Sequence, residues 1–388
     1  MIFLGKDMES NPDPDSLLLR LIFIVIYGIT FLLLLARWRT TTQYIKKNLW
    51  LSLLIALAVV SVLWSTIPGI SLRKVISLIG TTGFGIYLGT QYKFEEQLKI
   101  LSWSFGVSIL CSFAFIFLMP VYGVMNTEAI SGAWRGIYPH KNSLGVSMFI
   151  SFLSFYILSL SQPKSKYNWL FKTATLASTI LTYFSESATS FVSILLTYGM
   201  IQVLRGLSLR SKKSILIILI TFILLLLLQI IFIINFNQFL AANNKDITLS
   251  GRTFLWATIW EFMQLKLWFG YGYGTFFSSA HAETNLLWTV HDWGVMHAHN
   301  GYIQLCLDLG IIACLIFVIG YVYNFCKALL IYLAFKKYQM LWIFLFLNYT
   351  IFLNFTEVSF FSSNSIIWVV SICAIFSLST NSSNKKLQ

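Results

Sequence analysis

Long apolar segments recur along most of the sequence, and they restrict the fold more than any other feature of it. A helix needs about 20 apolar residues to cross the hydrocarbon layer of a membrane. Charged residues make up only 11% of the chain, whereas soluble domains contain about 25%. We therefore expect an all-α protein, a polytopic transmembrane helix bundle of about 11–12 spans. The segments assigned to spans are residues 17–36, 48–64, 75–91, 100–119, 143–161, 169–184, 188–204, 214–236, 302–325, 340–355 and 364–380.

Lysine and arginine indicate the orientation, because cytoplasmic loops of membrane proteins are enriched in these residues. If residues 37–47 are cytoplasmic, then so are every second connection after them and the C-terminal tail. These segments together hold 18 of the 27 lysine and arginine residues. We expect the N-terminus outside and the C-terminus inside. The net charge of +13 then marks the cytoplasmic side, and no nucleic-acid partner is needed to explain it.

We expect residues 1–388 to form a single integral membrane domain, with residues 237–301 as a long loop on its outer side. Connections of this length are usually functional. Within the loop, residues 249–268 have the pattern of a largely apolar helix, and the glycines of "GYGYGTFF" (270–277) predict turns after it. The five cysteines have neither disulfide nor zinc-site spacing.

The same loop carries most of the histidines, and three roles are open for them. They could bind a metal ion, they could be structural, or one could act as a general base near neutral pH. No two have the i, i+4 spacing of a helical zinc motif. The pair in "HAHNGY" (297–302) leads directly into an apolar span. The residues concerned are His281, His291, His297 and His299, with Asp292 and Glu283 nearby.

Several basic residues lie on the expected outer side, where the orientation rule disfavours them. They could extend to lipid headgroups, or they could bind an anion. Arg252 indicates the second role most clearly, because a cation in the first turn of a helix opposes the helix dipole unless an anion sits there. A phosphate at the membrane surface fits. The other outer basic candidates are Arg73, Arg135 and Lys141.

Two carboxylates are further candidates. Asp308 lies within an expected span, where an ionisable residue is a functional candidate by default, although a polar contact inside the bundle explains it equally well. Glu357 lies between the last two spans, on the expected outer face, and is a candidate acid or base.

Six motifs occur in an order that resembles the bacterial O-antigen ligase and polysaccharide polymerase superfamily. The "HKN" of the second motif and the "HAHNGY" that follows the long loop carry most of the resemblance, which extends from about residue 60 to residue 375. The "HKN" form is most similar to the exopolysaccharide-polymerising branch. The motifs are "WSTIPGISLRK" (64–74), "RGIYPHKNSLG" (135–145), "SGRTFLWATIWEF" (250–262), "LWFGYGYGTF" (267–276), "HAHNGYIQLCLDLG" (297–310) and "NFTEVSFF" (354–361).

The resemblance implies a glycosyltransferase of the bacterial inner membrane that acts on the periplasmic face. Its donor would be an oligosaccharide on undecaprenyl diphosphate, and its acceptor a glycan or lipid A-core. The reaction would invert the anomeric centre and use neither a metal nor a cofactor. Lipids and polysaccharide export or chain-length proteins would be its other partners.

By the same resemblance, Arg252 would bind the diphosphate and His299 would activate the acceptor, assisted by His297. His140 and Asn300, which belong to the two strongest motifs, are further candidates. Ligases commonly have an arginine in a Ser-x-Ser-Arg element, where "SESATS" (185–190) has Ala188. A second diphosphate contact would therefore come from Arg135 or Lys141.

The departure at Ala188 favours polymerisation of exopolysaccharide or O-antigen-type repeat units over ligation to lipid A-core. A lipid-linked oligosaccharide transporter and a scaffold subunit of an export complex are the alternatives from other classes. A transporter is expected to show repeat symmetry and several charged residues within spans. A scaffold would need none of the polar clusters.

Overall fold

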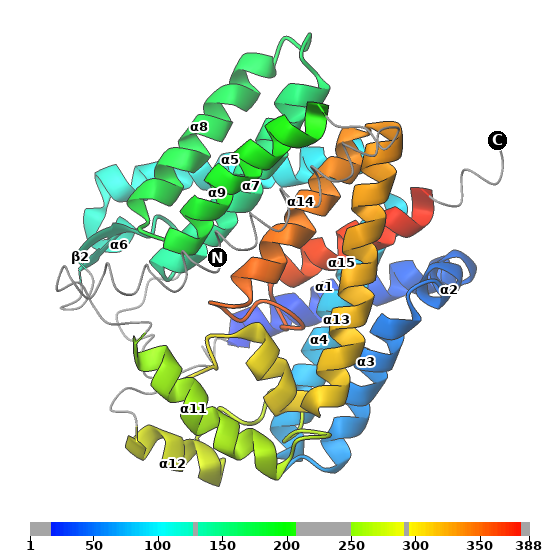
Figure 1. Cartoon of the computed structure of the whole chain (residues 1–388), viewed down its shortest axis with the longest axis vertical. Coiled ribbons are helices and arrows are strands. Elements are labelled where there is room, and N and C mark those ends of the chain that lie inside the picture. Colours follow the sequence, from blue (N-terminus) through cyan, green and yellow to red (C-terminus); the bar gives the residue numbers. More distant parts are fainter. Residues whose placement is uncertain (1–16, 127–130, 207–249, 291–294, 382–388) are drawn as a thin grey trace. The chain divides into compact units, whose positions relative to one another are not determined.

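The computed structural model describes residues 17–126, 131–206, 250–290 and 295–381, and this part is almost entirely helical (Figure 1). The chain divides into two compact units, each described here by itself. Among the described residues, the first unit comprises 94–126, 131–206, 250 and 327–352, and the second comprises 17–93, 251–290, 295–326 and 353–381. The single domain expected over residues 1–388 stays a prediction.

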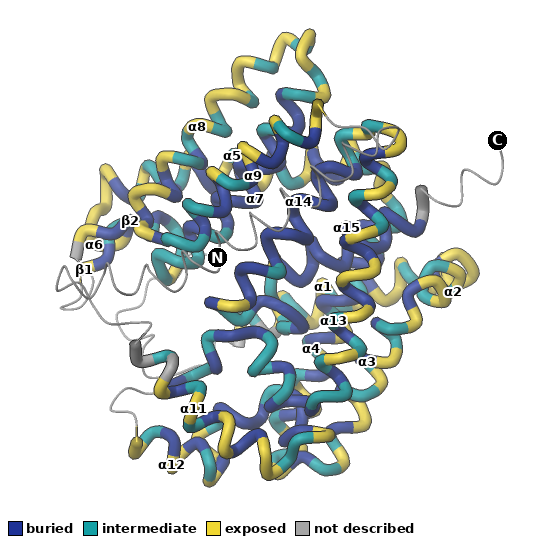
Figure 2. The backbone as a smooth tube through the Cα atoms, viewed as in Figure 1, coloured by how far each residue is buried: buried dark blue, intermediate teal, exposed yellow. Residues whose placement is uncertain are grey.

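The first unit is a bundle around α7. Helix α7 packs against α5, α8 and α9, and it is buried along nearly its whole length (Figure 2). Small hydroxyl side chains let the helices approach closely, as Ser151 and Ser178 show with a hydrogen bond of 2.7 Å between α7 and α8. Its elements are α5 (Phe94–Leu118), α6 (Pro120–Gly123), β1 (Val124–Asn126), β2 (Ser131–Trp134), α7 (Lys141–Ser161), α8 (Asn168–Phe184), α9 (Ala188–Gly206) and α14 (Tyr338–Leu353).

The second unit packs α4 against α15 and α1. Most of the described part of the long loop, from residue 251 onward, also belongs to this unit and contributes the helices α11 and α12. Its elements are α1 (Leu17–Ala36), α2 (Trp38–Lys46), α3 (Leu49–Val60), η1 (Ser61–Leu63), α4 (Pro68–Gln91), α11 (Ser250–Leu265), α12 (Ala282–Val290), α13 (Gly301–Phe335, as far as Cys326) and α15 (Ile366–Asn381).

The all-α class and the polytopic character are confirmed. Strands β1 and β2 form one short antiparallel pair and are the only strands among the described residues. Four described helices, α5, α7, α9 and α13, are long and apolar enough to cross a membrane, and the bent pair α1–α2 gives up to five. Ten of the eleven expected spans coincide with a helix, several of them shorter, whereas residues 214–236 lie outside the described residues. The total of about 11–12 spans stays a prediction.

Helix α13 is broken at Gly310, whose φ of 80° and ψ of 176° are not helical. A regular helix would join Ile311 N–H to the Leu307 carbonyl. Instead, Ile311 N–H donates to Leu267 O at 2.8 Å, and the Leu307 carbonyl accepts from Tyr271 N–H at 2.8 Å. Buried backbone groups need such partners, so the long loop supplies the hydrogen bonds that the helix loses at its break.

The break leads to a prediction about Gly310→Ala. A Cβ at this position would collide with the Trp268 carbonyl, and the φ of 80° is unfavourable for an L side chain. Strain of this kind costs about 1–3 kcal/mol, so we expect a clear loss of thermal stability in detergent. Gly199→Ala in α9, where nothing lies within 4 Å of the added Cβ, is the matched control. Equal melting temperatures for the two variants would contradict the prediction.

The described part of the long loop has a small core of its own. Leu255, Ile259, Phe262 and Met263 of α11 are buried with the i, i+4, i+7, i+8 spacing of one helix face. Aromatic side chains after the glycine turns and Leu287 of α12 complete this core. The predicted helix and glycine turns are confirmed, since Gly270, Gly272 and Gly274 all have positive φ. The described part of the loop is thus a packed element, and its core includes Val295 and Ala298 beside the two histidines.

Candidate functional site

A cluster in the second unit brings together a cation, a carboxylate and two imidazoles. Arg252 comes from the first turn of α11, His297 and His299 precede α13, and Glu357 lies in the segment between α14 and α15. The Arg252 guanidinium lies 3.7 Å from the Glu357 carboxylate. It also donates to the Thr356 carbonyl at 2.9 Å. Three segments far apart in the sequence thus meet at one carboxylate.

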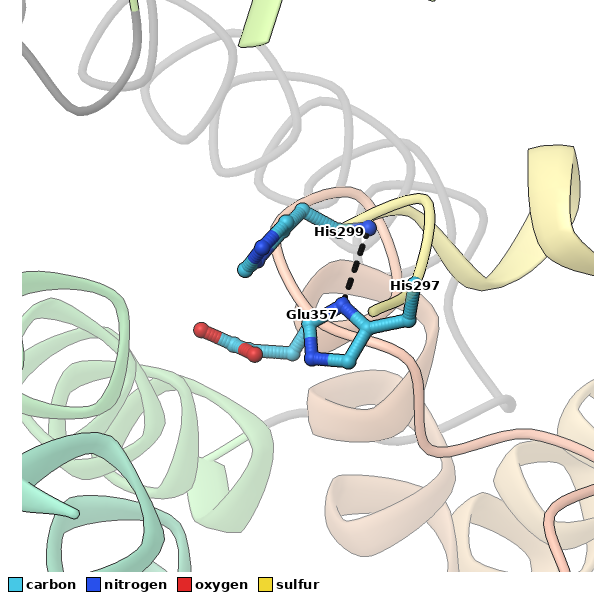
Figure 3. Close-up of side chains that lie close together, drawn as sticks. All are labelled: His297, His299 and Glu357. Atoms are coloured by element: carbon cyan, nitrogen blue, oxygen red, sulfur yellow. Dashed lines mark hydrogen bonds between the residues drawn. The ribbon is translucent and has the colours of Figure 1, made fainter. Parts of the chain in front are cut away.

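The two histidines lie side by side and close to Glu357. Their ring centroids are 4.0 Å apart, and the backbone N–H of His299 donates to Nδ1 of His297 at 3.3 Å (Figure 3). His299 has a φ of 48°, a left-handed conformation that is uncommon for a residue other than glycine. Such strain persists only where the surroundings fix it, and it is frequent at active sites.

The neighbouring contacts hold this turn in place. The Trp256 indole of α11 donates to the Ala298 carbonyl at 2.8 Å. The Asn300 side chain accepts from the N–H groups of Tyr302 and Ile303, at 3.0 and 3.1 Å, and so caps α13. Gly301 N–H donates to the Asn354 carbonyl at 2.8 Å, next to the Glu357 segment. Asn300 is therefore a positioning residue of the histidine turn.

Burial shapes the electrostatics of Arg252. The side chain is only 11% exposed, and this desolvation lowers the pKa of the guanidinium, while the negative charge of Glu357 acts in the opposite direction. Removing a cation from water is costly unless an anion lies beside it. Arg252 thus depends on an anionic partner, which is Glu357 in this structure.

The cluster also has the spacing of a metal site. His297, His299 and Glu357 each offer one ligand atom, and these atoms lie within 4.8 Å of one another. Two imidazoles and a carboxylate suit Zn²⁺. Arg252 opposes this role, because its positive charge already neutralises the carboxylate that a divalent ion would need. Treatment with a chelator separates a metal site from an acid–base site.

Asp308 and Arg73, two further sequence candidates of the second unit, are not members of this cluster. Asp308 is buried in α13 beside the break, and Gln304 donates to its carboxylate at 3.3 Å. That contact agrees with the structural role that the sequence left open for it. Arg73 is exposed on α4. His291 and Asp292 lie outside the described residues.

The candidates of the first unit are held by local contacts. Arg135 donates from Nε to the Tyr122 carbonyl at 2.8 Å and so closes the end of α6. His140 is the N-cap of α7, where its Nδ1 accepts from Asn142 N–H at 3.2 Å. Lys141 lies 3.7 Å from Glu186, which belongs to the "SESATS" turn. Of the three, Lys141 is the one beside the turn where Ala188 replaces the ligase arginine.

His281 and Glu283 form a separate pair inside the loop. The His281 side chain is 1% exposed, its Nδ1 lies 2.7 Å from a Glu283 oxygen, and its ring contacts Tyr271 and Phe276. Burial lowers the pKa of His281, and Glu283 only partly offsets this effect. The geometry therefore indicates a structural histidine that stays neutral in the folded loop.

A pH prediction follows for stability. The unfolded chain binds a proton at His281 more readily than the folded chain, so acid favours unfolding. We expect the melting temperature to fall as the pH drops below about 6.5, the ordinary histidine value, and to depend less on pH in His281→Gln. Tryptophan fluorescence suits this measurement, since Trp256 and Trp288 pack against the loop core. An unchanged pH dependence in the variant would show that other groups cause the effect.

Some residues of the site are not evident from sequence. Trp256 and Asn354 position the histidine turn through contacts with residues 42 and 53 positions away in the chain. Only their places in the motifs "SGRTFLWATIWEF" and "NFTEVSFF" mark them. The ion pair of Arg252 with Glu357 has no local signal in the sequence. Thr356, the residue just before Glu357, is 104 positions away from Arg252.

Two comparisons with known proteins show what the chain is similar to. Residues 173–318 match the O-antigen ligase family, a region that includes Arg252 and both histidines but not Glu357. The exopolysaccharide production protein ExoQ of Rhizobium meliloti (strain 1021) is 23% identical over 301 residues, which cover 74% of this chain and 67% of that protein.

The apolar helices indicate a multi-pass membrane protein, and the two matches support a membrane enzyme of the ligase or polymerase type. The resemblance indicated by the sequence motifs is thereby confirmed: the chain is similar to the O-antigen ligase family and to a protein of exopolysaccharide production.

Proposed function

We propose that this protein transfers a glycan from undecaprenyl diphosphate to an acceptor hydroxyl on the periplasmic face of the bacterial inner membrane, and that it thereby polymerises exopolysaccharide or O-antigen-type repeat units. The observation that carries the proposal is the cluster of Arg252, Glu357 and His299 in one place. It combines a cation for an anionic leaving group with a base for a hydroxyl.

The bond changes define what each residue does. The acceptor oxygen bonds to the anomeric carbon, and the bond from that carbon to the phosphate oxygen breaks. The leaving diphosphate takes the bonding electron pair, and Arg252 stabilises its growing negative charge. His299 accepts the acceptor's proton and later releases it to water. Attack from the face opposite the diphosphate inverts the anomeric centre.

Lys141 is our candidate for a second contact with the diphosphate. Its side chain is 19% exposed and its present partner is Glu186 at 3.7 Å. Arg135 is a weaker candidate, because its Nε is already hydrogen bonded to the end of α6. Arg73, exposed on α4, remains a further candidate for contact with the donor.

Ligation to lipid A-core is the second candidate function, because the matched family is that of the O-antigen ligases. The match to a protein named for exopolysaccharide production favours polymerisation. The test supplies purified protein in proteoliposomes with an undecaprenyl-diphosphate-linked repeat unit. A polymerase elongates this substrate alone, whereas a ligase consumes it only when lipid A-core is added. Movement of the intact lipid-linked oligosaccharide across the bilayer without transfer would identify a transporter.

The orientation makes a prediction of its own. Because lysine and arginine accumulate on alternate connections, we expect a reporter fused after Lys213 to be cytoplasmic and one inserted near Asn243 to be periplasmic. Alkaline phosphatase and green fluorescent protein fusions report the two sides. The reverse pattern would put the histidine cluster on the cytoplasmic face and contradict the proposed donor side.

A further inference from the structure

One carboxylate serves two kinds of neighbour in the cluster. Glu357 lies 3.7 Å from the Arg252 guanidinium, and its ligand oxygen is within 4.8 Å of ligand nitrogens of both His297 and His299. Figure 3 shows the carboxylate on the same side of the histidine turn as the His299 ring. The single negative charge is thus within reach of a cation and of the candidate base.

The contact between Arg252 and Glu357 is long for an ion pair, and Arg252 has a second, shorter contact that fixes it in place. Charge-assisted hydrogen bonds between nitrogen and oxygen are about 2.7–2.9 Å long, and the pair measures 3.7 Å. The Glu357 side chain is 23% exposed. Arg252, in contrast, is fixed by the Thr356 carbonyl at 2.9 Å and is 11% exposed. The arginine therefore stays in place when its carboxylate partner leaves.

A diphosphate is a stronger partner for this arginine than a carboxylate. It carries more negative charge, and it offers paired oxygens that match the guanidinium fork. The first turn of α11, where Arg252 lies, adds the attraction of a helix N-terminus for anions. A bound diphosphate also repels Glu357, which has the same sign of charge.

We propose that Glu357 is an exchangeable counter-ion: it neutralises Arg252 while the donor is absent, and it moves to His299 when the donor's diphosphate takes its place. The inference rests on the proposed function. A carboxylate beside an imidazole orients the ring and stabilises it after it has accepted a proton. Donor binding thus brings the carboxylate to the base, His299. Glu357 is a positioning residue that couples donor binding at Arg252 to proton transfer at His299.

The test separates binding from turnover in Glu357→Gln. The amide removes the competing charge, so we expect undecaprenyl diphosphate to bind about 2- to 10-fold more tightly, the scale of a loose ion pair with added charge repulsion. The same variant should lose about 10-fold or more in kcat, because His299 lacks its carboxylate. Glu283→Gln, which changes the same charge beside His281, is the matched control and should not tighten binding.

The outcomes are distinct from those that test the proposed function. If the wild-type protein neither binds undecaprenyl diphosphate nor transfers a glycan, the proposed function is wrong. If the wild type is active but Glu357→Gln binds the lipid diphosphate equally or more weakly, or retains its full kcat, the counter-ion exchange is wrong. Inorganic pyrophosphate as a second ligand shows whether the gain in affinity belongs to the diphosphate group.

A measurement on the unaltered protein covers the case in which the variant does not fold. With ¹⁵N-labelled histidine, undecaprenyl diphosphate should shift the ring signal of His299, because the carboxylate arrives beside it. An unchanged ring signal at saturating lipid would overturn the exchange. The His281 signal serves as an internal reference, since that ring is already beside Glu283.

Discussion

Replacing His299 with alanine is expected to lower turnover by about 10²- to 10⁴-fold, the usual contribution of a positioned general base. Binding of undecaprenyl diphosphate should survive, because the imidazole is assigned to the acceptor. His297→Ala should have a milder effect, since that ring accepts the backbone N–H of His299 at 3.3 Å and orients it. Turnover is measured with lipid-linked repeat units in proteoliposomes.

Two controls separate the chemistry of His299 from its backbone conformation. Asparagine tolerates the left-handed φ of 48° but is not a base, so His299→Asn should fold and remain as inactive as the alanine variant. A chelator should leave the wild-type rate unchanged if the histidines act as base and partner. If either variant had wild-type activity, or if a chelator abolished the activity of the wild-type protein, the assignment of His299 as a base would be wrong.

The pH profile gives an independent view of the same step. An imidazole accepts a proton only when it is neutral, so the wild-type rate at saturating donor should fall as the pH decreases and the ring becomes protonated. The fall should be absent from the residual activity of His299→Asn. Because acid also favours unfolding through His281, the profile needs a parallel measurement of folded protein at each pH.

Replacing Arg252 with alanine is expected to abolish transfer while the protein remains in the membrane. The guanidinium is the cation assigned to the leaving diphosphate, and stabilisation of developing charge is usually the largest catalytic contribution. Arg252→Lys should recover little, because a lysine cannot bind a diphosphate with a planar fork while it also donates to the Thr356 carbonyl.

The matched control for Arg252 is Lys266→Ala. Lys266 is a cation of the same loop, but it lies over the Tyr271 ring at 4.7 Å, outside the cluster. We expect this variant to retain transfer activity. If Arg252→Ala were fully active, or if both variants lost activity equally, Arg252 would have no specific role in binding the donor.

Much of the fold can be predicted from the sequence because apolar length and periodicity are local properties. The spans around residues 143–161 and 188–204 correspond to α7 and α9, and the glycine turns after α11 are where the sequence predicts them. The break at Gly310 could not be predicted, since its cause is a set of hydrogen bonds from residues about 40 positions earlier.

The candidate site shows the same division. Arg252 and His299 could be selected one at a time, from an arginine in a first helical turn and a histidine pair before a span. Their meeting at Glu357 is a tertiary contact between segments that no local pattern links. His281 is a histidine of the same loop as His299, yet its burial and its contact with Glu283 indicate a structural role.

The repaired break in α13 has a consequence for how the protein is made. Residues 267–272 leave the ribosome before residues 307–311, so the partners of the broken turn are synthesised first. A chain that lacks the loop would leave the backbone groups around Gly310 without these partners, and unpaired buried N–H and carbonyl groups are costly. The broken turn of this helix can therefore complete its hydrogen bonds only together with the loop, whose residues are already present when the helix is made.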